Sequence, residues 1–112
     1  MVGSYGFGSV EVDGEVYGHD VIYCRGKVTR WWRETGHKVK PADVELLLEQ
    51  PPEVVVFGTG AMGLMKVTNE ARAALEEAGI EVIAERTARA IERYNALAAE
   101  GRNVALAIHL TC

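Results

Sequence analysis

The sequence has too few cysteines to build a disulfide framework. It contains two, Cys24 and Cys112, which lie far apart in the chain, whereas small disulfide-stapled domains use four or more. Free thiols are typical of a reducing compartment, and no amino-terminal run is apolar enough to indicate a signal peptide. No stretch approaches the roughly 20 apolar residues that cross a bilayer. These absences together predict a cytoplasmic protein that does not enter a membrane.

Metal-ligand spacing is also missing. The histidines and cysteines form neither C-x-x-C nor H-x-x-x-H pairs, which are common in zinc sites, so we expect no metal and no cofactor. The sequence has no internal repeat, low-complexity tract or linker. Hydrophobic residues make up 48% of the 112 residues, which is enough for a core without staples. Residues 1–112 are therefore expected to form one domain.

Negative charge predominates, but it is unevenly distributed. The formal net charge of −4 argues against nucleic-acid binding. The segment from Arg25 to Lys40 nevertheless holds six basic residues and one acid, Glu34, so it carries +5 and the remainder carries −9. This segment also contains Trp31 and Trp32. A stacking surface for single-stranded nucleic acid is one interpretation, but aromatic and arginine side chains together are favoured at protein interfaces, which we prefer.

The first 40 residues show the alternation of an antiparallel β-meander. The pairs Asp13-Gly14 and Arg25-Gly26 are favourable turns between strands. The predicted strands span residues 7–12, 16–24 and 27–33. In the last of these, successive side chains point to opposite faces, so we expect one tryptophan in the core and the other at a protein contact.

From Pro41 onward the pattern changes to alternating strands and helices. Continuous apolar runs indicate buried parallel strands, and apolar residues at helical spacing indicate amphipathic helices. The predicted order is a helix from Pro41 to Pro51, a strand at 53–57, a helix at 68–78 capped by Thr68, a strand at 80–84, a helix from Thr87 to Gly101, and a strand at 104–110. The fold class is therefore α/β, with the antiparallel meander joined to a β-α-β-α-β unit. Because such crossovers make the strands parallel, the three strands end on one edge of the sheet.

The loop Gly58–Gly63 matches the G-x-G-x-x-G pattern after a strand, and Glu85 lies where an acid would bind a ribose. A dinucleotide site needs a helix that opens inside the motif, but here the helix starts near Thr68. The chain also has no room for a second nucleotide-binding half. We prefer to explain the glycines by a tight turn with close main-chain approach, and another anion or small ligand held by main-chain N–H groups is the next alternative.

His109 and Cys112 follow the last strand, three positions apart. A histidine can activate a thiolate, but residues three apart in a strand face opposite ways, so contact requires a turn. The alternative is a buried histidine beside a space-filling thiol. The candidate ligand residues of this edge are Gly58, Thr59, Gly60, Glu85, Arg86, His109 and Cys112. We assign none of them a catalytic role.

Several stretches together resemble a small uncharacterised family, the Mth938-like domains. They comprise residues 5–9, 20–23, 31–37, 55–60, 87–88, 94–95, 101–105 and 109–112. This family also includes the adipogenesis-associated domain protein and a mitochondrial assembly factor of respiratory complex I. The resemblance implies a three-layer β/β/α fold with a mixed sheet and no established catalytic activity. It also implies a role in binding other proteins.

The leading hypothesis is a non-enzymatic protein-binding or assembly module, and a homodimer is one form that such binding could take. Its expected contact residues are Arg30, Trp31, Trp32, Arg33 and His37. The alternative is binding of a small anion, or thiol chemistry, at the edge where the parallel strands end.

Overall fold

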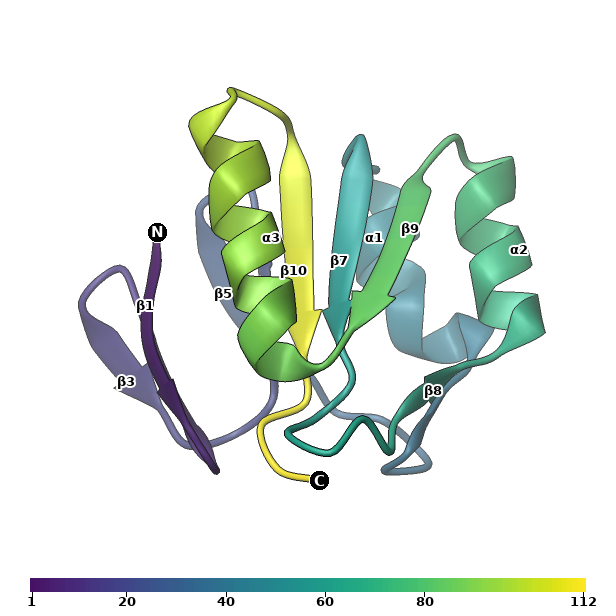
Figure 1. Cartoon of the computed structure of the whole chain (residues 1–112). Helices are drawn as coiled ribbons and strands as arrows, with labels where there is room; N and C mark the ends of the chain where they lie inside the picture. The colour runs from purple at the N-terminus through teal and green to yellow at the C-terminus, as the bar shows by residue number, and fades with distance from the viewer.

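The computed structural model describes all 112 residues, and a five-stranded mixed sheet lies at its centre (Figure 1). The strand order is β5-β4-β10-β7-β9. β10, β7 and β9 run parallel, and β4 and β5 continue the sheet as antiparallel strands. The bounds are Val21–Cys24 (β4), Lys27–Arg30 (β5), Val54–Gly58 (β7), Glu81–Glu85 (β9) and Val104–Ile108 (β10). The predicted β-α-β-α-β unit is confirmed.

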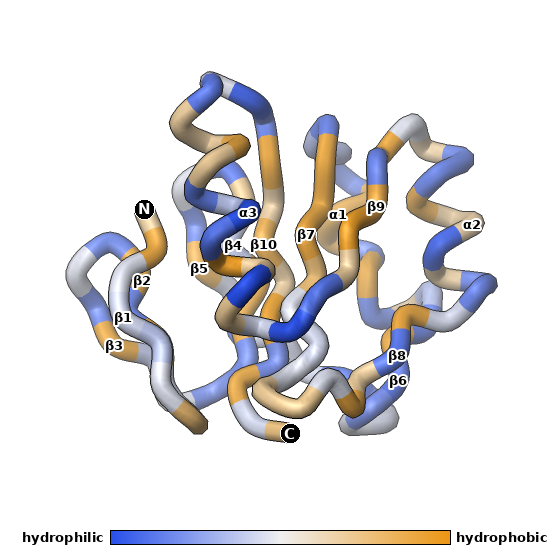
Figure 2. Tube along the Cα trace, viewed as in Figure 1, coloured by the Kyte–Doolittle hydropathy of each residue, from blue (hydrophilic) through white to orange (hydrophobic).

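The two central strands are buried along their whole length. Every residue of β7 and β10 is buried, because helices or another sheet cover both faces, and Figure 2 shows these strands as apolar traces. The parallel register pairs Val104 with Val54 and Ile108 with Gly58. The two strands therefore end at the same level, which places the residues that follow them side by side.

Helices cover the sheet on both faces. The helix α3 (Thr87–Ala99) packs on one face, while the 3-10 turn η1 (Pro41–Val44), α1 (Glu45–Glu49) and α2 (Asn69–Glu77) pack on the other. Each face has its own apolar core, of 14 and 13 buried residues. Fully burying one large apolar side chain contributes about 1.5–3 kcal/mol, so both layers stabilise the sheet. No helix combines the length and the apolarity needed to cross a membrane.

The amino-terminal third departs from the predicted single meander. Its first three strands form a separate antiparallel sheet (Figure 1). This small sheet lies beside α3, on the same side of the central sheet, and shares its apolar core. The bounds are Val2–Gly6 (β1), Ser9–Val12 (β2) and Glu15–Tyr17 (β3). The predicted strand at 16–24 is wrong, because the chain leaves one sheet after Tyr17 and enters the other at Val21. The strand β1 was not predicted, since its glycines hide the alternation.

The predicted strand at 27–33 ends early. It stops at Arg30. The next residue, Trp31, faces the core, where its ring packs 6.0 Å from that of Phe57 and its Nε1–H donates to the Asp43 carbonyl at 2.9 Å. The chain then forms a short parallel pair, β6 (Lys38–Val39) with β8 (Lys66–Val67).

Candidate functional site

Three segments meet at the carboxyl edge of the parallel strands, as the sequence predicts. β7 leads into the loop Gly58–Gly63, β9 into residues 85–86, and β10 into residues 109–112. The His109 N–H donates to the Gly58 carbonyl at 2.9 Å. Figure 1 shows these segments gathered below the sheet, next to the carboxyl end of the chain. The predicted ligand residues are therefore neighbours, and their ligand-binding role stays a prediction.

The glycine loop uses its main-chain donors within the chain. From Thr59 to Met65, every N–H group donates to an acceptor of the protein. The N–H groups of Met62 and Leu64 converge on the main-chain oxygen of Cys112, at 3.2 and 3.1 Å. A loop that binds a phosphate must present free N–H groups. In this conformation the loop instead holds the chain's own residues.

The loop glycines are explained by close packing. Gly60 has φ +104°, and a Cβ there would overlap the main-chain carbon of Cys112. The helix α2 begins at Asn69, where the Thr68 hydroxyl accepts the Ala71 N–H at 3.2 Å. No helix opens inside the motif, so the structure lacks the arrangement that a dinucleotide site needs.

Thr87 is the first residue of α3, and its side chain joins two loops of this edge. The N-cap position of α3 is occupied by Arg86, which makes no side-chain capping bond. The fully buried Thr87 hydroxyl donates to the His109 carbonyl at 2.6 Å and accepts the Gly60 N–H at 2.9 Å. It therefore ties together the loops that follow β7 and β10.

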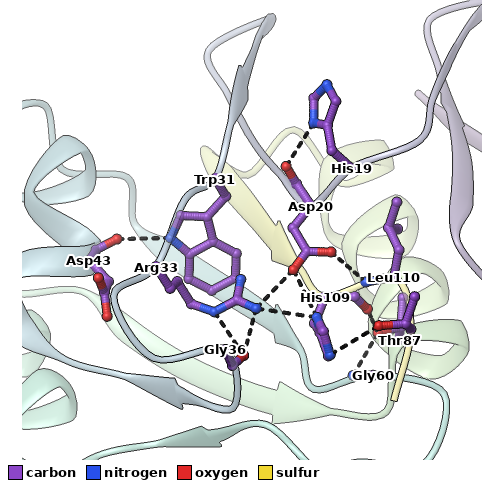
Figure 3. Close-up of polar contacts among 11 residues, drawn as sticks. His19, Asp20, Trp31, Arg33, Gly36, Asp43, Gly60, Thr87, His109 and Leu110 are labelled. Atoms are coloured by element: carbon purple, nitrogen blue, oxygen red, sulfur yellow. Dashed lines mark hydrogen bonds and ion pairs between the residues drawn. The ribbon is translucent and has the colours of Figure 1, made fainter.

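A buried polar cluster of Asp20, Arg33 and His109 lies at this edge (Figure 3). Asp20 Oδ2 accepts from His109 Nδ1 and from Arg33 Nη2, each at 2.8 Å. Its other oxygen, Oδ1, accepts the Leu110 N–H at 2.8 Å. One carboxylate thus joins the start of β4, the segment after β5 and the end of β10.

The charge state of Asp20 determines which ring nitrogen of His109 carries a hydrogen. Burial raises the pKa of this carboxyl, but hydrogen bonds from His109, the Leu110 N–H and Arg33 outweigh burial and leave the pKa below its usual value. Because an ionised carboxylate only accepts, His109 Nδ1 must carry a hydrogen. The other ring nitrogen, Nε2, faces the Thr111 hydroxyl at 3.4 Å. The histidine is therefore oriented from both sides.

Arg33 lies inside the protein, contrary to its predicted place on a contact surface. Its side chain is 4% exposed, and its Nε and Nη2 donate to the Gly36 carbonyl at 3.3 and 2.7 Å. Its Cζ lies 4.4 Å from the centre of the Trp31 ring, which provides a cation–π contact. The remaining nitrogen, Nη1, is buried without a hydrogen-bond acceptor. Arg33 and Trp31 are thus built into the fold.

The expectation of one buried and one exposed tryptophan is confirmed. Trp31 is 5% exposed and Trp32 is 74% exposed. Arg30 and His37 are also exposed, and the His37 ring packs edge-on against that of His109, with 5.3 Å between ring centres. The contact segment and the carboxyl edge, which the sequence treats as two sites, are therefore adjacent.

The other predicted edge residues have partners or face solvent. The Glu85 carboxylate pairs with Arg93 at 3.0 Å and with Arg89 at 3.8 Å. Arg86 is exposed and Cys112 is half-buried. No hydrogen bond joins the Cys112 thiol to His109. The cavity that the structure contains, about 340 Å³, lies elsewhere, between β4, β5 and α1.

Comparison with known proteins places the chain in a family. The sequence profile described as "Protein of unknown function (DUF498/DUF598)" matches residues 2–109. This chain belongs to that family. Its members have no function in that description, so membership supplies the fold and leaves the activity open.

Solved structures of similar proteins agree with this assignment. This family member matches the conserved hypothetical protein PH1505 from Pyrococcus horikoshii OT3 with a TM-score of 0.91 and 28% identity, over 100% of this chain and 99% of the other. It matches MT938 with a TM-score of 0.86 and 31% identity, over 100% and 98%. It matches a Bordetella pertussis protein, described as a Mth938-like domain, with a TM-score of 0.70 and 28% identity, over 98% and 85%. The predicted resemblance to the Mth938-like domains is confirmed.

The DUF498 fold adds to this site one polar residue, Asp20, that the sequence did not lead us to predict. Asp20 is separated from His109 by 89 positions, so no local spacing signals their contact. The only local sign is that Asp20 directly precedes an apolar strand, β4, whose first three residues are buried. An acidic residue at the start of a buried strand requires hydrogen-bond donors nearby.

Proposed function

We propose that this Mth938-like domain is a non-enzymatic protein-binding module whose contact surface is centred on Trp32. The 74% exposure of this indole carries the proposal. Tryptophan is enriched among the few residues that dominate the free energy of protein association, and contiguous exposed apolar surface marks interaction sites. We call Arg30, Trp32 and His37 the Trp32 surface.

Further exposed apolar side chains lie close to this surface. Met62 and Leu64 of the glycine loop are 63% and 48% exposed. The loop is joined to the Trp32 surface where the Lys66 N–H donates to the His37 carbonyl at 2.9 Å. Exposed apolar side chains on neighbouring segments, together with basic residues, support association with another protein.

The chemistry of the carboxyl edge supports binding over catalysis. Asp20, Arg33 and His109 are engaged with one another, and the cavity lies on another part of the molecule. A protein partner remains preferred to nucleic acid because the chain has a net charge of −4. A second copy of the chain is the alternative partner, and the cytoplasm is the proposed location.

Trp32→Ala tests this function, with Val16→Ala as its matched control because Val16 is also 74% exposed. Partner capture from a cell extract and native mass spectrometry would report hetero- and homo-association. Losing a central aromatic anchor costs about 2 kcal/mol or more, which is about a 30-fold weaker association. The control should bind like the wild type. Unchanged capture and unchanged oligomeric state in Trp32→Ala would overturn the proposal.

A further inference from the structure

The strand β5 is an outer strand with one unpaired side. It pairs only with β4. The main-chain groups of Lys27, Thr29 and Trp31 point toward β4, as the bond from the Trp31 N–H to the Asp20 carbonyl shows. Because these directions alternate along an antiparallel strand, the N–H and C=O groups of Val28 and Arg30 point outward. Such groups can pair with a further strand.

Positive charge without counter-ions lines this strand. Arg25, Lys27 and Arg30 are exposed, and none of them forms an ion pair within 4.0 Å. By contrast, Arg93 pairs with Glu85 and Arg102 pairs with Glu53. In a chain of net charge −4, this local excess attracts an acidic partner and repels a basic one.

A cavity lies beside the strand on the face covered by α1. It has a volume of about 340 Å³. It exists because α1 is only five residues long and leaves this corner of the sheet uncovered. Its lining residues are Cys24, Arg25, Lys27, Thr29, Leu46, Glu49 and Gln50. The two cations outnumber the one carboxylate, so the cavity favours a negatively charged side chain.

Protection against aggregation explains the charges but not the cavity. Lysine on an outer strand discourages unwanted pairing, and this device needs no hollow beside it. A strand added to β5 would lie about 4.8 Å away. Alternate side chains of that strand would point toward α1 and the cavity, on the same face as Lys27 and Thr29.

We propose that β5 is a docking edge for an extended acidic segment of a partner protein. The segment pairs with the outward main-chain groups of Val28 and Arg30 as a sixth strand. It directs a carboxylate side chain into the cavity beside Arg25 and Lys27. This inference rests on the proposed protein-binding function and specifies the class of partner. Trp32, two residues beyond the strand, anchors the same segment.

Charge argues against a second copy of the chain as the occupant. Symmetric antiparallel pairing of β5 with itself would bring Lys27 and Arg30 of one copy close to the same residues of the other. Like charges opposed across strands are destabilising. The acidic outer strand on the other side of the sheet, β9, already has its carboxylates paired, since Glu81 contacts Arg102 at 4.0 Å and Glu85 contacts Arg93 at 3.0 Å.

The experiment is a selection of random dodecapeptides displayed on phage against the full chain. The most enriched peptide is then synthesised with a fluorescent label. We expect Asp or Glu alternating with β-branched residues in the enriched peptides, and binding that weakens as salt increases. On saturation, hydrogen exchange measured by NMR should slow at the amides of Val28 and Arg30. Failure to enrich acidic peptides, or unchanged exchange at both amides, overturns the proposal.

Two variants of one position separate main-chain pairing from side-chain contact. Val28→Pro removes the outward N–H, which makes no bond with β4, and proline is tolerated on outer strands. Val28→Ala keeps that N–H and serves as the matched control. We expect Val28→Pro to weaken peptide binding at least about tenfold, whereas Val28→Ala stays close to the wild type. Equal affinities would overturn strand pairing.

A second pair of variants tests the cations without altering the main chain, so it applies even if Val28→Pro does not fold. Lys27→Gln should weaken binding of the acidic peptide and reduce its salt dependence. Arg72→Gln, on the helix α2 near the opposite outer strand β9, makes the same change of charge away from β5 and is the control, which should leave both unchanged. Equal effects of the two glutamine variants would overturn the assigned role of the cavity.

The failures of the two proposals are distinguishable. If Trp32→Ala abolishes binding but Val28→Pro does not, the binding module stands and strand pairing is overturned. If neither variant weakens binding, both proposals are overturned. If native mass spectrometry shows a dimer that Val28→Pro dissociates, the edge pairs with a second copy, which overturns the acidic partner.

Discussion

The Asp20 carboxylate is the point at which the structure makes its strongest quantitative prediction. Asp20→Ala removes the acceptor of three hydrogen bonds, each 2.8 Å long, from Arg33, His109 and the Leu110 N–H. Arg33 is only 4% exposed at its side chain, so its charge would remain buried. The Gly36 carbonyl would remain an acceptor, and His109 Nδ1 would lie 3.2 Å from Arg33 Nη2, but no negative charge would face the guanidinium.

The expected loss follows from this burial. Removing one partner of a buried ion pair costs about 3–5 kcal/mol. Because the Asp20 side chain is 18% exposed, water can replace part of the interaction and we expect a loss near the lower value, about 3 kcal/mol. The free energy of unfolding of a small domain is about 5–15 kcal/mol. The variant should therefore fold but lose a large part of its stability.

Urea denaturation followed by circular dichroism measures this loss, and a double-mutant cycle assigns it. In Asp20→Ala combined with Arg33→Met, the unpaired buried charge is gone. The double variant should thus lose less than the sum of the single losses, by at least about 1 kcal/mol. Glu92→Ala, an exposed acid without an ion pair, should change stability by no more than about 0.5 kcal/mol. Additive losses would refute the coupling between Asp20 and Arg33.

Two further predictions concern pH and the glycine loop. The folded pKa of Asp20 lies below its ordinary value of 3.8, so its ionised form stabilises the fold above that pH and the stabilisation disappears as the pH falls through the folded pKa. Urea midpoints measured from pH 6 downward should therefore drop less steeply in Asp20→Asn than in the wild type, and parallel curves would contradict this. Gly60→Ala combines φ +104° with overlap of Cys112, whereas Gly14→Ala has φ +86° and nothing within 4 Å of the new Cβ. Gly60→Ala should lose about 3 kcal/mol or more and Gly14→Ala about 1 kcal/mol, and equal thermal midpoints would contradict the packing argument.

The sequence predicts the parallel half of the fold well because its signals are local. The short apolar runs in β7 and β10 are typical of buried parallel strands, and Thr68 marks the start of α2 through its own hydroxyl. In the amino-terminal third, alternation alone could not reveal that the chain changes sheet after Tyr17. Two strands of one sheet and two strands of different sheets alternate in the same way.

The candidate site was only partly predictable for a related reason. Arg33 resembles a surface residue in the sequence. Alternation predicts that one tryptophan faces the core but does not say which, because the contacts of Trp31 with Phe57 and Asp43 join residues distant in sequence. The same is true of Asp20, whose partner His109 lies at the other end of the chain. Polar contacts between residues distant in sequence produce no periodic pattern from which they could be predicted.

The main-chain hydrogen bonds at the two edges of the sheet explain why we expect binding at β5 and not at the carboxyl edge. In open α/β sheets that edge normally receives the ligand. Here the amides of the glycine loop bond to residues of this chain, Thr87 joins Gly60 to His109, and Asp20 accepts the Leu110 N–H. A partner there would have to displace bonds that already exist. At β5 the outward groups of Val28 and Arg30 have only water to exchange, so a new strand forms its bonds without breaking any of the fold's own.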